Sequence, residues 1–498
     1  MELEHTTVKE LKLYDSVVRE QPVEADIALP EYYPAVGRIL KCFVDPSEES
    51  VTFSEGRVSV AGAAAVRVLY ADDENALHCY RTEVKYTKIL PTDVRDEHAA
   101  VRVTQDVRSL NCRALGPKRL EIKAGIAVRA ELLGIRGTQI VTAAGENLQL
   151  RTETADCCEP VCVYCREFTE SETLRCDAGG KKLRTVIDAS AVPVTEKTEI
   201  ISNKIMVRGR NRVTVLCAAE DGSVARYELS VPFSEVLDCY GVSEQTAVNV
   251  VFSRSAAEAS LQDDTDNVFD VSVKNDLLIL ATQQRELTYV SDAYALRGEA
   301  ECAFSELTVA RAVAQGCEEE HISAETEAYE DGGFSVKAVF VNDISYAVAN
   351  RSADGCVEGS LCFNVLIADE EGRFSLLTKN VTFEHRLPEG ASCTACQIVA
   401  KNAQGERMAG GKLSVACTLE LTLLTENGSP LRMLTGVKES ADAAAAGQEK
   451  AVVYFAEKGE TLWDIAKENR TSVANIKAYN ALSSEVLETD ARLIFSCF

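Results

Sequence analysis

A pattern of about 150 residues recurs three times in this chain, and it constrains the fold more than any other feature. In each copy a glycine is followed seven residues later by a leucine, and 147 and 150 residues separate the successive glycines. Valine stands two residues before each glycine, and valine or phenylalanine stands four and six residues after it. These apolar positions share one face of a β-strand, because side chains alternate with period two. The glycine–leucine pairs are Gly62 with Leu69, Gly209 with Leu216, and Gly359 with Leu366.

Each copy continues with an acidic turn and then with an aromatic residue 24 positions after the glycine. A glycine inside a strand marks a bulge, a bend or a close approach of the backbone. The acidic turn predicts a hairpin that joins the glycine strand to the next strand. A copy of this length exceeds a solenoid unit and is large enough to be a domain. The acidic turns are 72–75, 220–222 and 369–372, and the aromatic residues are Tyr86, Phe233 and Phe383.

The second half of each copy contains another alternating segment, and helical periodicity is scarce before residue 435. These segments are 119–131, 267–273 and 412–424. We therefore predict a mostly β protein, with three β-rich, sandwich-like repeat domains followed by a small βααβ domain. A small, polar stretch without a core pattern predicts a linker before that last domain. The predicted boundaries are 1–150, 151–300 and 301–436 for the repeats, 437–450 for the linker and 451–498 for the last domain.

The last 48 residues have a different pattern from the repeats. Residues 451–456 predict a short strand, and a turn then leads into a helix with apolar residues at i, i+3 and i+4 from Leu462. Thr471 or Ser472 is expected to cap a second helix over 473–479. Residues 492–495 predict a closing strand.

This segment resembles the LysM domain, whose signature it meets almost in full. Glu460 stands where the family usually has aspartate, Ala481 stands where asparagine is common, and the usual final Ile-Pro is absent. The residues that carry the resemblance are Tyr454, Gly459, Thr461, Leu462, Trp463, Ile465, Ala466, Ile476, Asn480 and Leu482.

The resemblance implies a groove that binds N-acetylglucosamine polymers, between the first strand-to-helix loop and the loop after the second helix. The departures at Glu460 and Ala481 lie in that groove, so the ligand could be a protein as well as a glycan. Trp463 is the only tryptophan of the chain, and it either packs on the small core or anchors a partner from the surface. The candidate partner- or glycan-binding residues are Gly459, Glu460, Thr461, Leu462, Trp463, Ile476, Lys477, Asn480, Ala481 and Leu482.

The combination of three β-rich repeats with one C-terminal LysM domain resembles the spore coat morphogenetic proteins of the SipL type, which carry SPOCS domains. The resemblance implies a scaffold that acts in the mother-cell cytoplasm, at the forespore surface. It also implies that the LysM domain binds the morphogenetic ATPase of the coat basement layer, and that the repeats contact other coat proteins. The alternative function is a protein that binds peptidoglycan through its LysM domain.

Charge and composition exclude several other functions. The formal net charge of −26 argues against nucleic-acid binding, which needs a basic surface. The first residues show no secretory signal and no apolar run is long enough for a transmembrane segment, so we expect a cytosolic protein. No catalytic motif is present either, and we expect neither an enzyme nor a cofactor.

A group of cysteines between the first two repeats gives a weak candidate metal site. Zinc is held by four ligands in a tetrahedral arrangement, and a Cys-x-x-Cys pair supplies two of them. Unpaired cytosolic thiols, or thiols that later cross-link a coat, are the alternatives. The candidate ligands are Cys158, Cys162, Cys165 and Cys176, with Cys157 as an alternative to Cys158.

Overall fold

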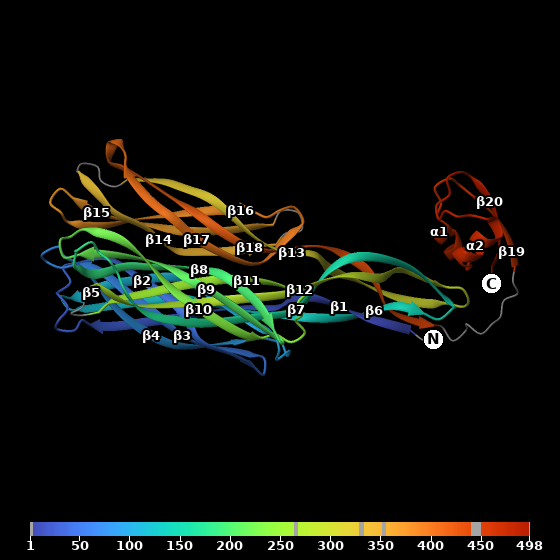
Figure 1. Cartoon of the computed structure of the whole chain (residues 1–498), viewed down its shortest axis with the longest axis horizontal. Helices are drawn as coiled ribbons and strands as arrows, with labels where there is room; N and C mark the ends of the chain where they lie inside the picture. The colour runs from blue at the N-terminus through green and yellow to red at the C-terminus, as the bar shows by residue number, and fades with distance from the viewer. Residues whose placement is uncertain (1–2, 263–266, 328–332, 351–354, 440–449, 498) are drawn as a thin grey trace.

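The computed structural model describes residues 3–262, 267–327, 333–350, 355–439 and 450–497. Up to residue 439 it consists of β-strands in three consecutive groups of six, here called units 1, 2 and 3 (Figure 1). Unit 1 contains β1 (Leu3–Ala28), β2 (Arg38–Ser54), β3 (Arg57–Ala71), β4 (Leu77–Pro91), β5 (Ala100–Gly116) and β6 (Arg119–Ala144). Unit 2 contains β7 (Leu148–Arg175), β8 (Leu183–Ile201), β9 (Lys204–Ala219), β10 (Val224–Asp238), β11 (Ala247–Leu261) and β12 (Val268–Ala295). Unit 3 contains β13 (Ala300–Glu327), β14 (Phe334–Ala349), β15 (Cys356–Asp369), β16 (Phe374–Arg386), β17 (Ala391–Arg407), a short 3-10 turn η1 (Ala409–Gly411) and β18 (Lys412–Glu439).

All three units have the same topology. In each unit the second, third and fourth strands form one antiparallel sheet, with the glycine strand in the centre. The first, sixth and fifth strands form the other sheet, with the sixth strand in the centre. The two sheets pack face to face, so the predicted sandwich-like repeats are confirmed. The three central strands of the second sheets, β6, β12 and β18, contain the alternating segments predicted from the sequence.

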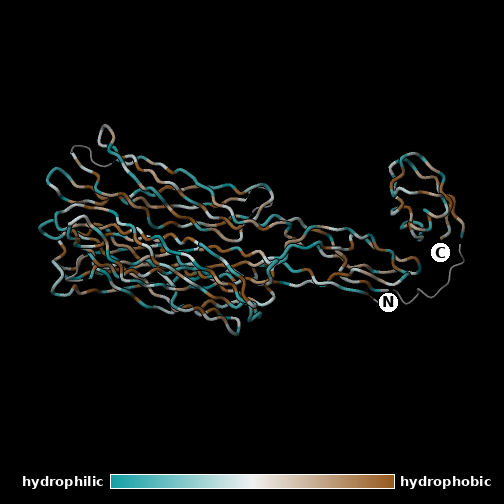
Figure 2. Tube along the Cα trace, viewed as in Figure 1, coloured by the Kyte–Doolittle hydropathy of each residue, from teal (hydrophilic) through white to brown (hydrophobic). Residues whose placement is uncertain are grey.

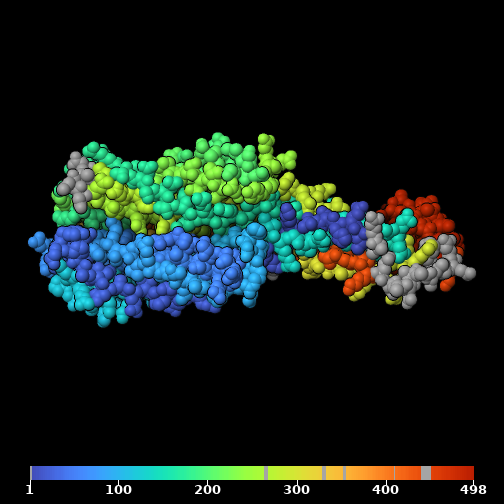
Figure 3. Space-filling model, turned by 90° about the horizontal axis from the view of Figure 1, so that it is seen from below, coloured from blue at the N-terminus to red at the C-terminus, as the bar shows by residue number. Residues whose placement is uncertain are grey.

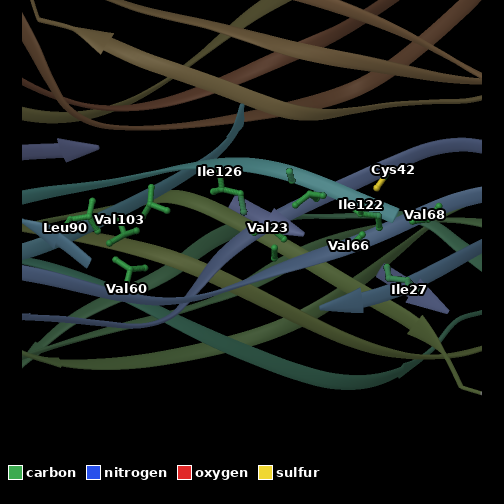
Figure 4. Packing of buried hydrophobic residues seen from close by; sticks show 14 of the residues in the cluster. Val23, Ile27, Cys42, Val60, Val66, Val68, Leu90, Val103, Ile122 and Ile126 are labelled. Atoms are coloured by element: carbon green, nitrogen blue, oxygen red, sulfur yellow. The ribbon is translucent and has the colours of Figure 1, made fainter. Parts of the chain in front are cut away.

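The apolar face of the glycine strand forms the core of each sandwich. In unit 1, Val60 and Val66 of β3 lie in one buried cluster with Ile122 and Ile126 of β6 (Figure 4). Hydrophobic and hydrophilic residues alternate along the strands, as a half-buried sheet requires (Figure 2).

The repeated glycine and the repeated aromatic residue are direct cross-strand partners. The register places Gly62 opposite Tyr86, Gly209 opposite Phe233 and Gly359 opposite Phe383. A Cβ atom added at these glycines would lie 2.4–2.7 Å from the aromatic ring. The glycine is therefore required because the ring of the neighbouring strand covers its backbone, which is one of the three alternatives that the sequence left open.

The leucine seven residues after each glycine points to the other face of its strand. Its side chain therefore leaves the sandwich core and packs between the units. One buried cluster brings together Leu69, Leu216 and Leu366, and it also contains Phe43, Ile187 and Phe340. The three equivalent sheets thus meet around a shared centre.

Three long antiparallel strand pairs extend beyond the sandwiches and form a shaft, and these pairs are β1–β6, β7–β12 and β13–β18 (Figure 1). These strands are 26 to 28 residues long. Two buried clusters hold the three strand pairs together, and one of them joins Ile140, Leu287 and Met433 from the three units. The sequence pattern did not predict the shaft.

The last domain lies at the far end of the shaft (Figure 1). Its elements are β19 (Lys450–Ala456), α1 (Leu462–Glu468), α2 (Val473–Asn480) and β20 (Ala491–Cys497), so the predicted βααβ order is confirmed. Most of the predicted linker falls on residues 440–449, which lie outside the described residues, and the domain boundaries stay a prediction. Among the described residues, neither α-helix is long and apolar enough to cross a bilayer.

Candidate functional site

The small C-terminal domain is built around one core. Leu462, Ile465 and Ala466 of α1 pack with Ile476 of α2 and Phe495 of β20, and all five are almost completely buried. The side chain of Thr461 accepts a hydrogen bond from the backbone N–H of Asp464 and caps α1. Of the two predicted caps of α2, Ser472 is the one that accepts from the helix, at the N–H of Asn475.

The first wall of the predicted groove is the loop 459–462. Its backbone pairs with residues 485–487, which come after α2: the N–H of Gly459 donates to the carbonyl of Leu487 at 2.9 Å, and that of Leu462 donates to Glu485 at 2.8 Å. The carboxylate of Glu460 accepts hydrogen bonds from the Glu457 N–H and the Tyr454 hydroxyl, so it closes the turn. The loop is therefore rigid, and Gly459 is exposed on it.

The second wall was predicted at residues 480–482. The Asn480 amide donates to the carbonyls of Ile476 and Ile494 at 2.8 and 2.7 Å, and its oxygen accepts from the N–H of Ile494. Its side chain thus fastens the end of α2 to β20. Ala481 ends the helix in a left-handed conformation, with φ of 52°.

The predicted binding residues therefore separate into groups with different environments. Leu462 and Ile476 are fully buried in the core and present no side-chain surface. Lys477 forms an ion pair of 3.0 Å with Glu485, beside the loop 459–462. Gly459 and Ala481 are exposed, and Glu460, Thr461, Asn480 and Leu482 are half-buried.

Trp463 does not point toward the groove but toward the shaft. Its indole Nε1 donates to Asp292 of β12 at 2.9 Å, and its ring meets the Tyr294 ring edge-on at 4.9 Å between centroids. Lys467 also donates to Asp292, and the Tyr294 hydroxyl donates to the carbonyl of Thr471. Trp463 thus packs partly on the core of its own domain and partly on unit 2, rather than standing free as a surface anchor.

The electrostatics of this contact follow from its partners. Burial alone would raise the pKa of Asp292, but the hydrogen bonds from Lys467 and Trp463 and the charge of Lys467 outweigh that effect and lower the pKa. Asp292 is therefore a carboxylate at neutral pH, and it holds the LysM-like domain against the shaft. No sequence pattern indicates this contact, because 171 residues separate its two ends.

Exposed apolar side chains gather on the opposite surface of the domain. Val453 and Phe455 alternate along the outer face of β19, and Val453 is the cross-strand neighbour of the exposed Ile494 of β20. Phe455 is 77% exposed. We call Val453, Phe455 and Ile494 the outer apolar face. It lies on the side of the two-stranded sheet that faces away from the core of the domain.

The four candidate zinc ligands do not come together. Cys158, Cys162 and Cys165 lie along the extended strand β7, and Cys176 follows its end. An extended strand advances about 3.3 Å per residue, so roughly 60 Å of chain separates Cys158 from Cys176. Cys162 and Cys165 also pack into different clusters, on opposite faces of β7. The four cysteines are therefore not placed to share one zinc ion in this structure.

The structure reveals charged groups between the units that sequence reasoning missed. A cavity of about 2850 Å³ is lined by all three units, along the seam that Figure 3 shows between units 1 and 2. At its wall, the guanidinium of Arg67 pairs with Asp45 of its own unit at 3.1 Å and with Asp188 of unit 2 at 3.0 Å. These residues come from separate repeats, so only the assembled fold brings them together.

A second group contains three carboxylates from two units. The side chains of Glu48, Glu167 and Asp276 place one oxygen each within 4.8 Å of one another. Burial raises the pKa of all three, that of Glu167 to about 8, while Arg254 and Lys274 act in the opposite direction. This cluster is a titratable contact between units 1 and 2.

Parts of units 1 and 2 and the C-terminal domain match known protein families. The SipL, SPOCS domain model matches residues 35–115 and 182–261, which correspond to β2–β5 of unit 1 and to β8–β11 of unit 2. The LysM domain model matches residues 456–496. Unit 3 lies outside the matched segments but repeats the topology of the other two. No curated protein and no solved structure matches the chain.

The two matched families are non-catalytic, and they occur here in the order that the sequence suggested. Two segments that match the SPOCS domain model, followed by a C-terminal LysM module of the glycan-binding class, make this a sporulation-related protein that is similar to the SipL type.

Proposed function

We propose that this protein is a non-enzymatic scaffold of spore coat assembly. Its LysM domain binds the morphogenetic ATPase of the coat basement layer, and the SPOCS units contact other coat proteins, so that the coat is tethered to the forespore surface from the mother-cell cytoplasm. The observation that carries this proposal is the domain combination, since SPOCS domains and a terminal LysM domain occur together in SipL-type proteins.

The architecture supports a scaffold. The three units share one buried cluster at their centre and a second one along the shaft, which gives an extended and rigid body. The LysM domain is held at the far end of that body by the contact with Asp292. A rigid spacer with a binding module at one end suits a tether better than it suits an enzyme.

The surface of the LysM domain supports a protein partner. A polysaccharide is recognised through hydrogen bonds, but the Asn480 amide and the Glu460 carboxylate are already bonded within the domain. The outer apolar face, in contrast, offers Phe455 and its neighbours for burial, which is the main source of protein–protein affinity. Glycan binding at the exposed loop 459–462 is the alternative function, favoured by the LysM family itself.

The test compares both ligands on the full-length protein. The purified chain is incubated with the purified ATPase and, separately, with insoluble peptidoglycan. A Phe455→Ser variant removes the most exposed apolar side chain of the outer face, and Tyr240→Ser, which removes an aromatic residue 79% exposed on unit 2, is the matched control.

The proposal expects ATPase binding that Phe455→Ser weakens at least tenfold and Tyr240→Ser leaves unchanged. Sedimentation with peptidoglycan and no retention of the ATPase would overturn the scaffold and establish the glycan-binding alternative. ATPase binding that is insensitive to Phe455→Ser would retain the partner but remove the outer apolar face as its site.

A further inference from the structure

Two thiols of unit 2 lie in direct contact across the sandwich. Cys162 belongs to β7 of one sheet, and Cys239 directly follows β10 of the other sheet. Their Sγ atoms are 2.7 Å apart. A disulfide bond is about 2.05 Å long, so a movement of less than 1 Å would bring the two sulfurs to bonding distance.

The two thiols have different environments. Cys239 is completely buried in an apolar cluster, whereas Cys162 is half-buried at the edge of the same cluster. The hydrogen bond between the two thiols lowers the pKa of Cys162 and raises that of Cys239. An accessible thiol with a lowered pKa beside a buried second thiol is the arrangement of a cysteine that reacts first and a cysteine that resolves.

We propose that Cys162 and Cys239 form an oxidisable dithiol that closes into an intrachain disulfide by exchange with a low-molecular-weight disulfide. The thiolate of Cys162 attacks one sulfur of the small disulfide, a mixed disulfide forms, and one small thiol leaves. The Cys239 thiolate then attacks the Cys162 sulfur, and the second small thiol leaves with its electron pair and takes up a proton. One small disulfide is thereby reduced to two thiols for each protein dithiol that is oxidised.

The disulfide would fasten the two sheets of the unit 2 sandwich to each other. It would close a loop between residues 77 positions apart, which restricts the unfolded chain and stabilises the folded one. Unit 2 would therefore become more stable when the surroundings become oxidising. This site is independent of the partner of the LysM domain, and it differs from thiols that link one chain to another.

The test uses the reduced full-length protein and oxidised glutathione as the probe. After incubation, remaining thiols are alkylated under denaturing conditions, and mass and disulfide-linked peptides are determined. The proposal expects two of the 18 cysteines to escape alkylation, linked to each other as Cys162–Cys239, and a rise in the thermal unfolding midpoint. Glutathione that stays attached to Cys162 in the wild type, or linkage of Cys162 to any other cysteine, would overturn it.

Variants separate the two chemical steps. In Cys239→Ala the resolving thiol is missing, so glutathione should remain on Cys162 as a mixed disulfide. Cys317→Ser removes an exposed cysteine of unit 3 and should leave the Cys162–Cys239 peptide unchanged. The wild-type peptide map decides the question even where a variant fails to fold. Chains linked to each other on a non-reducing gel, without the intrachain peptide, would also contradict the proposal.

Discussion

The only tryptophan of the chain, Trp463, donates its indole hydrogen to the carboxylate of Asp292 at 2.9 Å, and this bond joins the LysM domain to the shaft of the SPOCS units. Lys467 donates to the same carboxylate. One acidic side chain on the tip of unit 2 therefore holds both the aromatic and the basic residue of α1. The contact leaves the outer apolar face of the domain free.

Replacement of Asp292 by alanine should release the LysM domain from the shaft. Hydrogen bonds to a charged group contribute roughly 1.5–3 kcal/mol, so docking should weaken by about that amount. Trp463 reports directly on the change: its fluorescence should shift to longer wavelength, and acrylamide should quench it more strongly.

Glu286→Ala is the matched control, because Glu286 is an exposed acidic residue of the same strand β12. The Trp463 fluorescence of the Glu286→Ala variant should match that of the wild type. Unchanged tryptophan emission in Asp292→Ala would show that Asp292 does not hold the domain.

The glycines of the repeat should differ in their tolerance of alanine. At Gly209 a Cβ would lie 2.1 Å from the Val194 carbonyl oxygen and 2.6 Å from the Phe233 ring, whereas at Gly62 it meets only the Tyr86 side chain. Since a backbone carbonyl cannot move aside cheaply, Gly209→Ala should destabilise by about 1–3 kcal/mol and Gly62→Ala by less.

Urea unfolding followed by circular dichroism measures these differences. Gly316→Ala is the control, because Gly316 also lies in a strand but has no atom within 4 Å of the added Cβ. Its stability should stay within about 0.5 kcal/mol of the wild type. Equal losses at Gly209 and Gly316 would contradict the role given to the close approach.

Much of the fold could be predicted because the residues that identify each glycine strand and its hairpin partner lie close together in the sequence. The alternation around Gly62 identifies a strand and its buried face, and the aromatic residue 24 positions later is the partner across the hairpin. The role of Leu69 could not be predicted, since its partners Leu216 and Leu366 belong to other units. The shaft could not be predicted for the same reason, because its core forms between strand pairs of three different units.

The candidate site could be predicted only in outline. The LysM signature located the domain, but a signature does not separate residues that bind from residues that fold. Leu462 and Ile476 fit the motif because they form the core, and Asn480 fits it because its amide fastens α2 to β20. The direction of Trp463 depends on Asp292, which is distant in sequence.

The contact between units 1 and 2 should depend on pH through Glu167. Burial raises the pKa of Glu167 to about 8, above the ordinary value of 4.5, so between these values the folded state binds a proton more tightly than the unfolded state. The contribution of protonated Glu167 to the free energy of unfolding is therefore complete below about pH 4.5, and it is lost as the pH rises through 8. After allowance for its partial exposure, the loss should be roughly 1–2 kcal/mol.

Thermal unfolding between pH 5.5 and 8.5 measures this dependence. Glu167→Gln keeps the shape of the side chain without its charge, and it should flatten the pH profile and raise the unfolding midpoint at pH 8.5. Glu172→Gln, an exposed position on the same strand, should leave the profile unchanged. Parallel profiles for the wild type and Glu167→Gln would assign the pH dependence to other groups.

The end of α2 provides a last prediction, because Ala481 adopts a left-handed conformation that favours glycine. Its Cβ is strained there, so Ala481→Gly should stabilise the LysM domain by roughly 0.5–1 kcal/mol. Ala474→Gly is the opposite control: Ala474 is exposed inside the same helix, where glycine costs about 1 kcal/mol. Hydrogen exchange of the amides of α2 in the full-length protein measures both effects. Slower exchange in Ala481→Gly and faster exchange in Ala474→Gly are expected, whereas faster exchange in both would show that the left-handed position imposes no strain.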